Sequence, residues 1–593
     1  MSRALRTLSA TATAAGAAAA AAYKIGDFGV GDALRLARDV QRGPVILTLD
    51  LTRPLRVREA TGLAALRTRG RPTLREVVET LLQSAGDERV VALVGHIGGR
   101  VGGLATVQEL REAVATFTAT GKPAVAYCDA FGGEGGNGTL DYLLASAFSE
   151  IHLQPTGDLA LLGVASEVTF MRGALDKAGI EPQFGHRHEY KNAADQLTEH
   201  DFTPAHREAL GALVDNWADQ IVDAVAAARR VGRDVVRQAI DDAPLSAGQA
   251  VERGMVDRIA YRDETLEQVR ARVTPDAELT LLQDYRSTSR ARHRWHARNA
   301  PVVALITARG AITQTRRGDA MSRSGITADV LGAALRRAAD DDDIAAVLLH
   351  VDSTGGSAVA SDTIRRAVLT TRRAGTPVVA WMGDFAASGG YYIAMAADEI
   401  VAQPGTLTGS IGVVGGKAVT NELERKLGLE TRAITSGANA RFFSWATGFD
   451  SEQRARLEDW LDRVYDDFTA RVAEDRGLTR ERVHELARGR IWSGAQAHER
   501  GLVDRLGGYA TALAAVRTTL GLPADAPLRL HTYPPQPSLP DRLRGKDVED
   551  PAEQHLAAVM AALAGDAGTL RDTLREWLQP AGVLTMPFVP RQR

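Results

Sequence analysis

Cysteine is almost missing from this chain of 593 residues, because Cys128 is the only one. A single cysteine excludes an internal disulfide, a cysteine-based zinc site and an iron–sulfur cluster. An excess of one charge is also missing, since the formal net charge is −3 and the pI is near 6.5. This balance does not favour nucleic acid or a strongly acidic substrate as a partner.

Long apolar runs are missing as well, and the N-terminal leader over 1–43 is the only candidate for a membrane segment. Arg3 and Arg6 precede an uncharged, Ala/Thr-rich run over 7–23, which is the layout of a signal peptide or an anchor. Alanine contributes little to transfer into lipid, and the run is at the short end of the roughly 17 to 25 residues that a spanning helix needs. The leader could equally be a plain Ala-rich helix or a disordered segment. We therefore expect a membrane-associated protein, with a cytoplasmic one as the alternative.

The most informative feature present is an internal repeat. GQAVERGMVDRI over 248–259 and AQAHERGLVDRL over 495–506 agree at eight of twelve positions. Such self-similarity at long range indicates that one domain has been duplicated.

The repeat gives a domain plan. We expect a first repeat over 44–284 and a second over 301–530. The basic, turn-rich segment over 285–300 is interpreted as an exposed linker. The final segment, 531–593, contains a Pro-rich connector and a pattern typical of a helix.

Two hydrophobic periods alternate along each repeat. Short runs such as VVALIT (302–307) and PVVAWM (377–382) are typical of buried strands. ADVLGAALRRAADD (328–341) and SDTIRRAVLTTRRAG (361–375) have apolar residues at helical spacing. This alternation predicts an α/β fold with mainly parallel strands and crossover helices.

A candidate nucleophile lies in GDFAASGGYY, residues 383–392. Ser388 follows a predicted strand and precedes a predicted helix, and no histidine lies within ten residues of it. Gly389 and Gly390 would let a substrate backbone approach closely. By itself the stretch is also compatible with a tight turn and a capping serine. It does not match the G-x-S-x-G pattern, because Ala386 stands two residues before the serine.

A second glycine turn precedes this one, in HVDSTGGSAVASDTI over 350–364. The backbone N–H of Gly355 or Gly356 could donate to a developing oxyanion. A diglycine turn is a weak signal alone, but the two turns together describe a nucleophile that faces an anion hole.

DSTGGS, GDFAASGGYYIA and PGTLTGSIGV, in this order, resemble the catalytic half of signal peptide peptidase A, the long two-domain form of the protease IV family. The resemblance implies tandem ClpP/crotonase-like domains and a serine peptidase with a lysine as general base. It implies Ser388 as the nucleophile and the N–H groups of Gly356 and Gly389 as the oxyanion hole. It also implies a homo-oligomer, a tetramer in this family.

In the long form the lysine comes from the first repeat, which implies Lys191 as the base and Ser410 as the residue that orients it. When the repeats are overlaid, Lys191 aligns with Ala440 and Ser410 with Leu161. The first repeat also has no serine where the second has Ser388. We therefore expect one composite site for each chain.

A lysine acts as a base near neutral pH only when its charged form is disfavoured, and burial among apolar groups achieves this. Cover for the Lys191 amine could come from Tyr190, Ala193, Ala194 and Leu197. Glu189 and Asp195 would stabilise the charged form if they faced it, so we expect them to face away.

These observations favour a serine endopeptidase with a Ser/Lys dyad that hydrolyses peptides such as cleaved signal peptides. A crotonase-type acyl-CoA enzyme would need a glutamate near the glycine turns, and the motifs offer none. A catalytically idle scaffold of the same family stays open. No cofactor is expected, and the His-x-His pair in GHRHE (185–189) lacks an identifiable third metal ligand.

Overall fold

The computed structural model describes residues 43–56, 72–99, 101–133, 135–314, 325–533 and 584–585. The expected leader over 1–43 lies outside this part of the chain except for Gly43. The expected connector and helix over 531–593 also lie outside it, except for 531–533 and 584–585. Within the described residues no helix is both long enough and apolar enough to cross a membrane.

The first repeat is built on a parallel sheet of six strands in the order β8-β4-β3-β2-β1-β9. Its strands are β1 (Val45–Leu51), β2 (Val90–Ile97), β3 (Ala124–Cys128), β4 (Glu150–Leu153), β8 (Arg258–Ile259) and β9 (Glu278–Leu281). The middle strands are buried runs of Val, Leu, Ile and Ala, which is the pattern of a sheet covered on both faces.

The second repeat has the same plan. Its central path is β17-β15-β13-β10-β21, and β16 and β20 continue from β15 beside it. These strands are β10 (Val302–Arg309), β13 (Ile344–Ser353), β15 (Val378–Ala387), β16 (Glu399–Ala402), β17 (Leu407–Gly409), β20 (Arg505–Leu506) and β21 (Arg529–Thr532). The antiparallel strand β19 (Ile491–Ser493) pairs with β17 at the edge.

Equivalent helices follow equivalent strands. In the first repeat they are α4 (Leu74–Ala85), α5 (Leu104–Thr118), α6 (Thr139–Ala145), α9 (Pro204–Arg229) and α12 (Arg262–Val273). In the second they are α14 (Ala328–Ala339), α15 (Ala358–Arg373), α16 (Gly389–Ala394), α18 (Ser451–Arg476) and α21 (Tyr509–Thr519). The order of elements therefore repeats along the chain, as a duplication requires.

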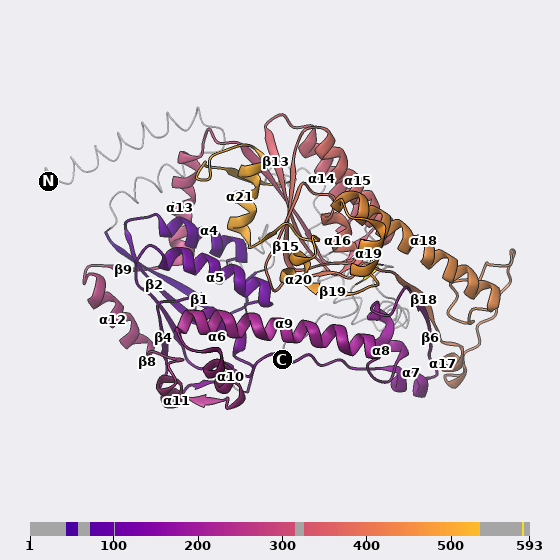
Figure 1. The fold of residues 1–593 in the computed structure, drawn as a ribbon, viewed down its shortest axis with the longest axis horizontal. Helices are drawn as coiled ribbons and strands as arrows, with labels where there is room; N and C mark the ends of the chain where they lie inside the picture. The colour runs from indigo at the N-terminus through magenta and orange to yellow at the C-terminus, as the bar shows by residue number, and fades with distance from the viewer. Residues whose placement is uncertain are drawn as a thin grey trace.

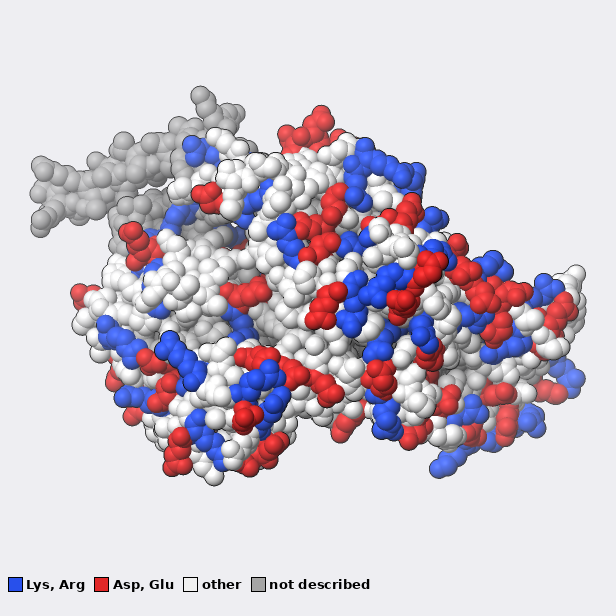
Figure 2. Space-filling view, in the orientation of Figure 1, with Lys and Arg blue, Asp and Glu red and all other residues white. Residues whose placement is uncertain are grey.

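The two repeats lie side by side and share apolar packing. Figure 1 shows the first repeat at the left, the second at the right, and α9 running along the lower side from one toward the other. One continuous buried cluster contains Leu47 and Val77 of the first repeat together with Trp381 and Tyr509 of the second. On the face shown in Figure 2, positive and negative side chains are interspersed over both repeats.

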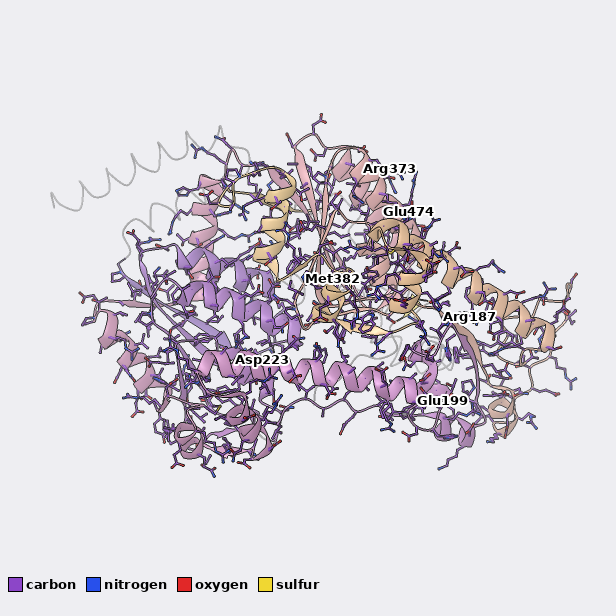
Figure 3. All side chains as sticks on the ribbon, in the orientation of Figure 1. Arg187, Glu199, Asp223, Arg373, Met382 and Glu474 are labelled. Atoms are coloured by element: carbon purple, nitrogen blue, oxygen red, sulfur yellow. The ribbon has the colours of Figure 1, made fainter. Side chains whose placement is uncertain are left out.

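A strand exchange carries part of the first repeat into the second. β6 (Glu181–His186) pairs antiparallel with β18 (Val414–Val419), with His186 opposite Val414. Just after β6, Arg187 donates to Glu458 of α18 at 2.7 Å, and Figure 3 shows its place beside that helix. The chain that follows β6 is thereby held against the second repeat.

The segment between the repeats differs from its expected structure. Residues expected to form an exposed, turn-rich linker belong to helix α13 (Leu282–His296), which packs on α4. Tyr285 is 3% exposed and donates to Asp87 at 2.8 Å, and Arg292 donates to the same carboxylate at 2.7 Å. The basic residues that suggested a solvated linker thus pair with acidic groups of the first repeat.

Candidate active site

Ser388 lies at a strained turn between β15 and α16. Its backbone has φ 56° and ψ −116°, a conformation that costs a non-glycine residue about 1–3 kcal/mol. The turn is held because Ser388 N–H donates to the Gly409 carbonyl at 2.8 Å and Tyr392 N–H donates to the Ser388 carbonyl at 2.9 Å. The side chain makes no capping hydrogen bond to the helix, so the serine does not act as the simple cap that the sequence alone allowed.

Lys191 of the first repeat reaches this serine. Its Nζ lies 2.9 Å from Ser388 Oγ, 3.0 Å from the Ser410 carbonyl oxygen and 3.0 Å from Ser410 Oγ. All three side chains are fully buried. The structure therefore brings together the serine and lysine expected from opposite repeats, with Ser410 beside them.

Burial lowers the pKa of Lys191 well below its ordinary value. A neutral amine has two N–H groups and one lone pair. The two N–H groups can donate to the carbonyl and hydroxyl oxygens of Ser410, which leaves the lone pair for the hydroxyl of Ser388.

The carboxylates near Lys191 in sequence are engaged elsewhere. Glu189 pairs with Arg488 at the surface, and Asp195 lies 3.1 Å from Nδ1 of His206. Ala194 instead packs with Phe184 of β6 and Val414 of β18. Burial therefore causes the lowered lysine pKa, and no carboxylate of the described residues pairs with the amine.

Two glycines that the sequence reasoning missed make room for the lysine. Gly489 has φ 84°, and a Cβ added there would lie 2.5 Å from Lys191 Cα. A Cβ on Gly412 would lie 3.2 Å from Lys191 Cδ. The sequence does carry a signal for Gly489. When the repeats are aligned on their ERG motifs, the first repeat has Asp242 at this position, so the glycine occurs only in the repeat that receives the lysine.

The two predicted oxyanion glycines lie next to each other. Gly356 ends the short strand β14 (Gly355–Gly356), and Gly389 begins α16 directly after Ser388. A Cβ on Gly389 would lie 3.1 Å from Gly356 N, and one on Gly356 would lie 2.2 Å from the Ile312 carbonyl oxygen. A side chain at Gly356 would therefore collide with the Ile312 backbone, and one at Gly389 would crowd the Gly356 N–H.

The edge of β14 accepts an extended backbone. The strand β22 (Leu584–Thr585), close to the C-terminus, pairs antiparallel with it. Leu584 lies opposite Gly356 and Thr585 opposite Gly355. An extended segment can thus add to the sheet beside the nucleophile.

Comparison with known proteins identifies the family. The sequence profile of peptidase family S49 matches residues 116–274 and 370–522, one stretch in each repeat. The chain belongs to peptidase family S49. The predicted protease IV membership and the tandem ClpP/crotonase-like α/β fold are therefore confirmed, and the family is one of serine peptidases.

Individual proteins similar to this chain include the chloroplastic serine protease SPPA of Arabidopsis thaliana, which is 31% identical over 80% of this chain and 70% of its own length. Protease 4 of Salmonella typhi is 29% identical over 74% of this chain and 71% of its own. Among solved structures, a mutant of the 1510-N membrane-bound stomatin-specific protease is 16% identical, covers 40% of this chain and 98% of its own, and has a TM-score of 0.25.

The two histidines of GHRHE do not form a metal centre with their neighbours. His186 Nδ1 lies 2.9 Å from the His188 carbonyl oxygen, and the His188 ring packs at a tilt against Tyr465 and edge-on to His484. Within the part of the chain that the structure describes, no group of three or more His, Cys, Asp or Glu side chains could hold a metal ion.

Proposed function

We propose that this chain is a serine endopeptidase in which Ser388 is the nucleophile and Lys191 the general base, and that it hydrolyses peptides such as cleaved signal peptides. The observation that carries the proposal is the 2.9 Å separation between Lys191 Nζ and Ser388 Oγ, with the amine fully buried and without a carboxylate partner among the described residues. A neutral lysine at hydrogen-bond distance can take the proton of a serine hydroxyl.

In the first half of the reaction, Lys191 Nζ accepts the Ser388 proton while Oγ attacks the carbonyl carbon of the scissile peptide bond. The negative oxygen of the tetrahedral intermediate accepts hydrogen bonds from the N–H groups of Gly356 and Gly389. Loss of one such donor costs about 3 kcal/mol in the transition state. Lys191 then protonates the leaving amine, and the peptide remains bound to Ser388 as an ester.

In the second half, water attacks the ester carbon and gives its proton to Lys191. The intermediate collapses, the carboxylic acid leaves, and the proton returns to Ser388 Oγ. Ser410 holds the amine in line throughout, because both its carbonyl and its hydroxyl lie 3.0 Å from Nζ. We therefore assign Ser410 as the lysine-positioning residue.

The substrate binds as an extended strand. One edge of β14 pairs with β22, which supports recognition of a peptide by strand addition in place of β22. Full burial of Ser388 and Lys191 further favours a narrow, unfolded chain over a folded surface. The apolar segments of cleaved signal peptides meet both conditions.

Two further parts of the proposal concern assembly and location. The chain forms a homo-oligomer, a tetramer as the family resemblance implies, and its leader over 1–43 associates it with a membrane, where signal peptides remain after cleavage. Sizing of the purified chain and flotation with vesicles, each with and without residues 1–43, measure these two properties.

An active-site probe tests the chemistry. A fluorophosphonate should label the wild type but not Ser388→Ala, and Lys191→Ala should lose hydrolysis of a fluorogenic peptide. The exposed Ser149→Ala and Lys177→Ala variants serve as matched controls and should keep both activities. Labelling that survives Ser388→Ala, or full turnover by Lys191→Ala, would overturn the dyad, and an unlabelled wild type would favour an idle scaffold.

A further inference from the structure

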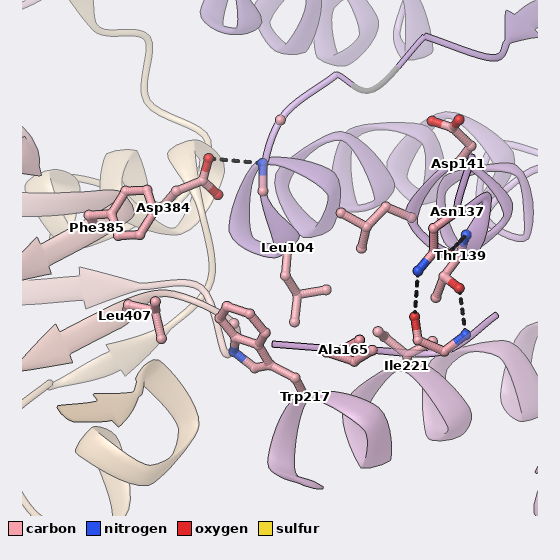
Figure 4. A pocket seen from close by; sticks show the side chains of 16 residues that line it. Leu104, Asn137, Thr139, Asp141, Ala165, Trp217, Ile221, Asp384, Phe385 and Leu407 are labelled. Carbon is pink, nitrogen blue, oxygen red and sulfur yellow. Dashed lines mark hydrogen bonds between the residues drawn. The ribbon is translucent and has the colours of Figure 1, made fainter. Parts of the chain in front are cut away.

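A cavity of about 280 Å³ lies between the two repeats, and neither Ser388 nor Lys191 lines it. Figure 4 shows that helices of the first repeat form one side and the ends of β15 and β17 of the second repeat form the other. Most of its wall is apolar, contributed by Leu104, Leu140, Trp217, Ile221, Phe385 and Leu407.

This cavity is the first repeat's counterpart of the catalytic centre. Thr139 takes the place of Ser388 when the repeats are overlaid with the offset that aligns their QP pairs, and it lines the cavity. Gly102 and Gly103 also line it. They lie between β2 and α5, as Gly355–Gly356 lies between β13 and α15 in the second repeat.

The counterpart centre has lost its chemistry. Thr139 Oγ1 accepts a hydrogen bond from Gly163 N–H at 2.9 Å, and nothing like Lys191 faces it among the lining residues. The Gly103 N–H donates to Asp384 Oδ2 at 3.1 Å, so it does not serve an oxyanion. What remains is a binding cavity without a nucleophile or an anion hole.

One polar group in the wall has no protein partner. Trp217 is 5% exposed, and its Nε1–H has no hydrogen-bond acceptor among the described residues. A buried donor of this kind carries a desolvation cost that a ligand carbonyl would relieve. The Asp384 carboxylate in the same wall disfavours an anionic ligand, so the cavity fits an apolar side chain next to a neutral carbonyl.

Two paired strands lead from the cavity wall toward the dyad. Phe385 of β15 pairs with Leu407 of β17, and both line the cavity. Ser388 and Ser410 come three residues further along the chain, directly after these two strands end. At about 3.3 Å per residue this separation is about 10 Å, or about three residues of an extended peptide.

We propose that this cavity binds an apolar side chain of the peptide being cleaved at Ser388, about three residues from the scissile bond, and that Trp217 Nε1–H donates to a backbone carbonyl of that peptide. The inference rests on the proposed function and adds a second recognition point to it. The first repeat thereby supplies substrate binding as well as the lysine.

Two aromatic substitutions on one loop test the cavity. Ala165 is an exposed residue at its rim, and Ala165→Trp should block the entrance without disturbing the core. Leu162 is 46% exposed on the same loop and does not line the cavity, so Leu162→Trp is the matched control. The substrates are two pairs of peptides and a small ester that reports only acylation of Ser388. Each pair differs by leucine or asparagine at the third residue from the cleaved bond, and one pair is varied on each side of that bond.

We expect Ala165→Trp to lower kcat/KM for one leucine peptide about tenfold, to the level of its asparagine counterpart, and to leave the ester unchanged. Trp217→Phe, which removes only the donor, should lower the same value about threefold. Leu162→Trp should change none of these values. An unchanged preference of Ala165→Trp for leucine, or an equal loss of kcat/KM in Leu162→Trp, would overturn the inference. The dyad would still be supported if these variants hydrolysed the ester. A wild type that fails to hydrolyse the ester would overturn the proposed function itself.

Discussion

Replacing Lys191 with methionine should stabilise the folded protein increasingly as the pH falls, while it abolishes peptide hydrolysis. Methionine has nearly the length of the lysine stem and no charge, so it suits a fully buried position better than a charged amine does. The reason lies in the two protonation states of the wild type. Burial lowers the pKa of Lys191 in the folded protein, whereas the unfolded chain binds the proton with a pKa near 10.4.

The magnitude follows from linkage. Between the lowered pKa and about 10.4 the unfolded wild type holds one more proton than the folded wild type, so wild-type stability rises with pH. Each pH unit in this window is worth about 1.4 kcal/mol. Lys191→Met lacks the titrating group. Its free energy of unfolding should therefore exceed that of the wild type by about 1.4 kcal/mol more for each pH unit from pH 10 down to the lowered pKa.

Urea titrations at pH 10, 9 and 8 measure this difference in the free energy of unfolding. The slope is diagnostic, because lost hydrogen bonds to Ser388 and Ser410 would shift all three values by the same amount. The exposed Lys177→Met variant is the matched control and should show no such slope. A difference that is constant with pH, or that grows as the pH rises, would refute a buried neutral lysine.

Three other changes give distinct results. Gly489→Ala should lower kcat/KM at least tenfold by displacing Lys191, whose Cα lies 2.5 Å from the added Cβ; Gly375→Ala, also at positive φ but with open space around it, controls for backbone strain and should keep activity. Burial raises the pKa of Glu109 to about 8, so the free energy of unfolding should fall as the pH rises from about 4.5 to 8. Glu109→Gln should remove this loss, which is at most about 5 kcal/mol at pH 8. Thermal or urea unfolding measures the difference. Deletion of 534–593 removes β22 from the edge of β14, where we propose that the peptide binds. Without this competitor, kcat/KM for peptides should rise at least about twofold. An unchanged value would show that β22 does not compete.

The α/β architecture could be predicted because two hydrophobic periods alternate along each repeat and a long repeated motif fixes the duplication. The helix α13 could not, because its basic residues and low apolar content suggest a loop when read alone. It is stabilised by partners far away in sequence, such as Asp87, which accepts from Tyr285 and Arg292. Tertiary pairing of this kind overrides the local pattern.

The resemblance to the protease IV family implied the positions of Ser388 and Lys191, and the two half-sites, each missing what the other keeps, agreed with it. The sequence could not reveal how the lysine crosses between repeats, since the pairing of β6 with β18 joins segments more than two hundred residues apart. It also could not reveal the apolar cavity around Trp217, because that cavity exists only where α9 meets β15 and β17. Both features are properties of the interface and leave no local pattern in either repeat.

The divided site makes the proposed activity depend on the interface. The costly backbone conformation of Ser388 is held within the second repeat. The burial that disfavours the charged form of Lys191 instead depends on the second repeat, where Ser388 and Ser410 contact the amine. Separation of the repeats would expose the amine to water, where it regains its proton and ceases to be a base. On the proposed mechanism, hydrolysis therefore begins only after β6 has paired with β18, so a chain with only one folded repeat has a serine and a lysine but no dyad.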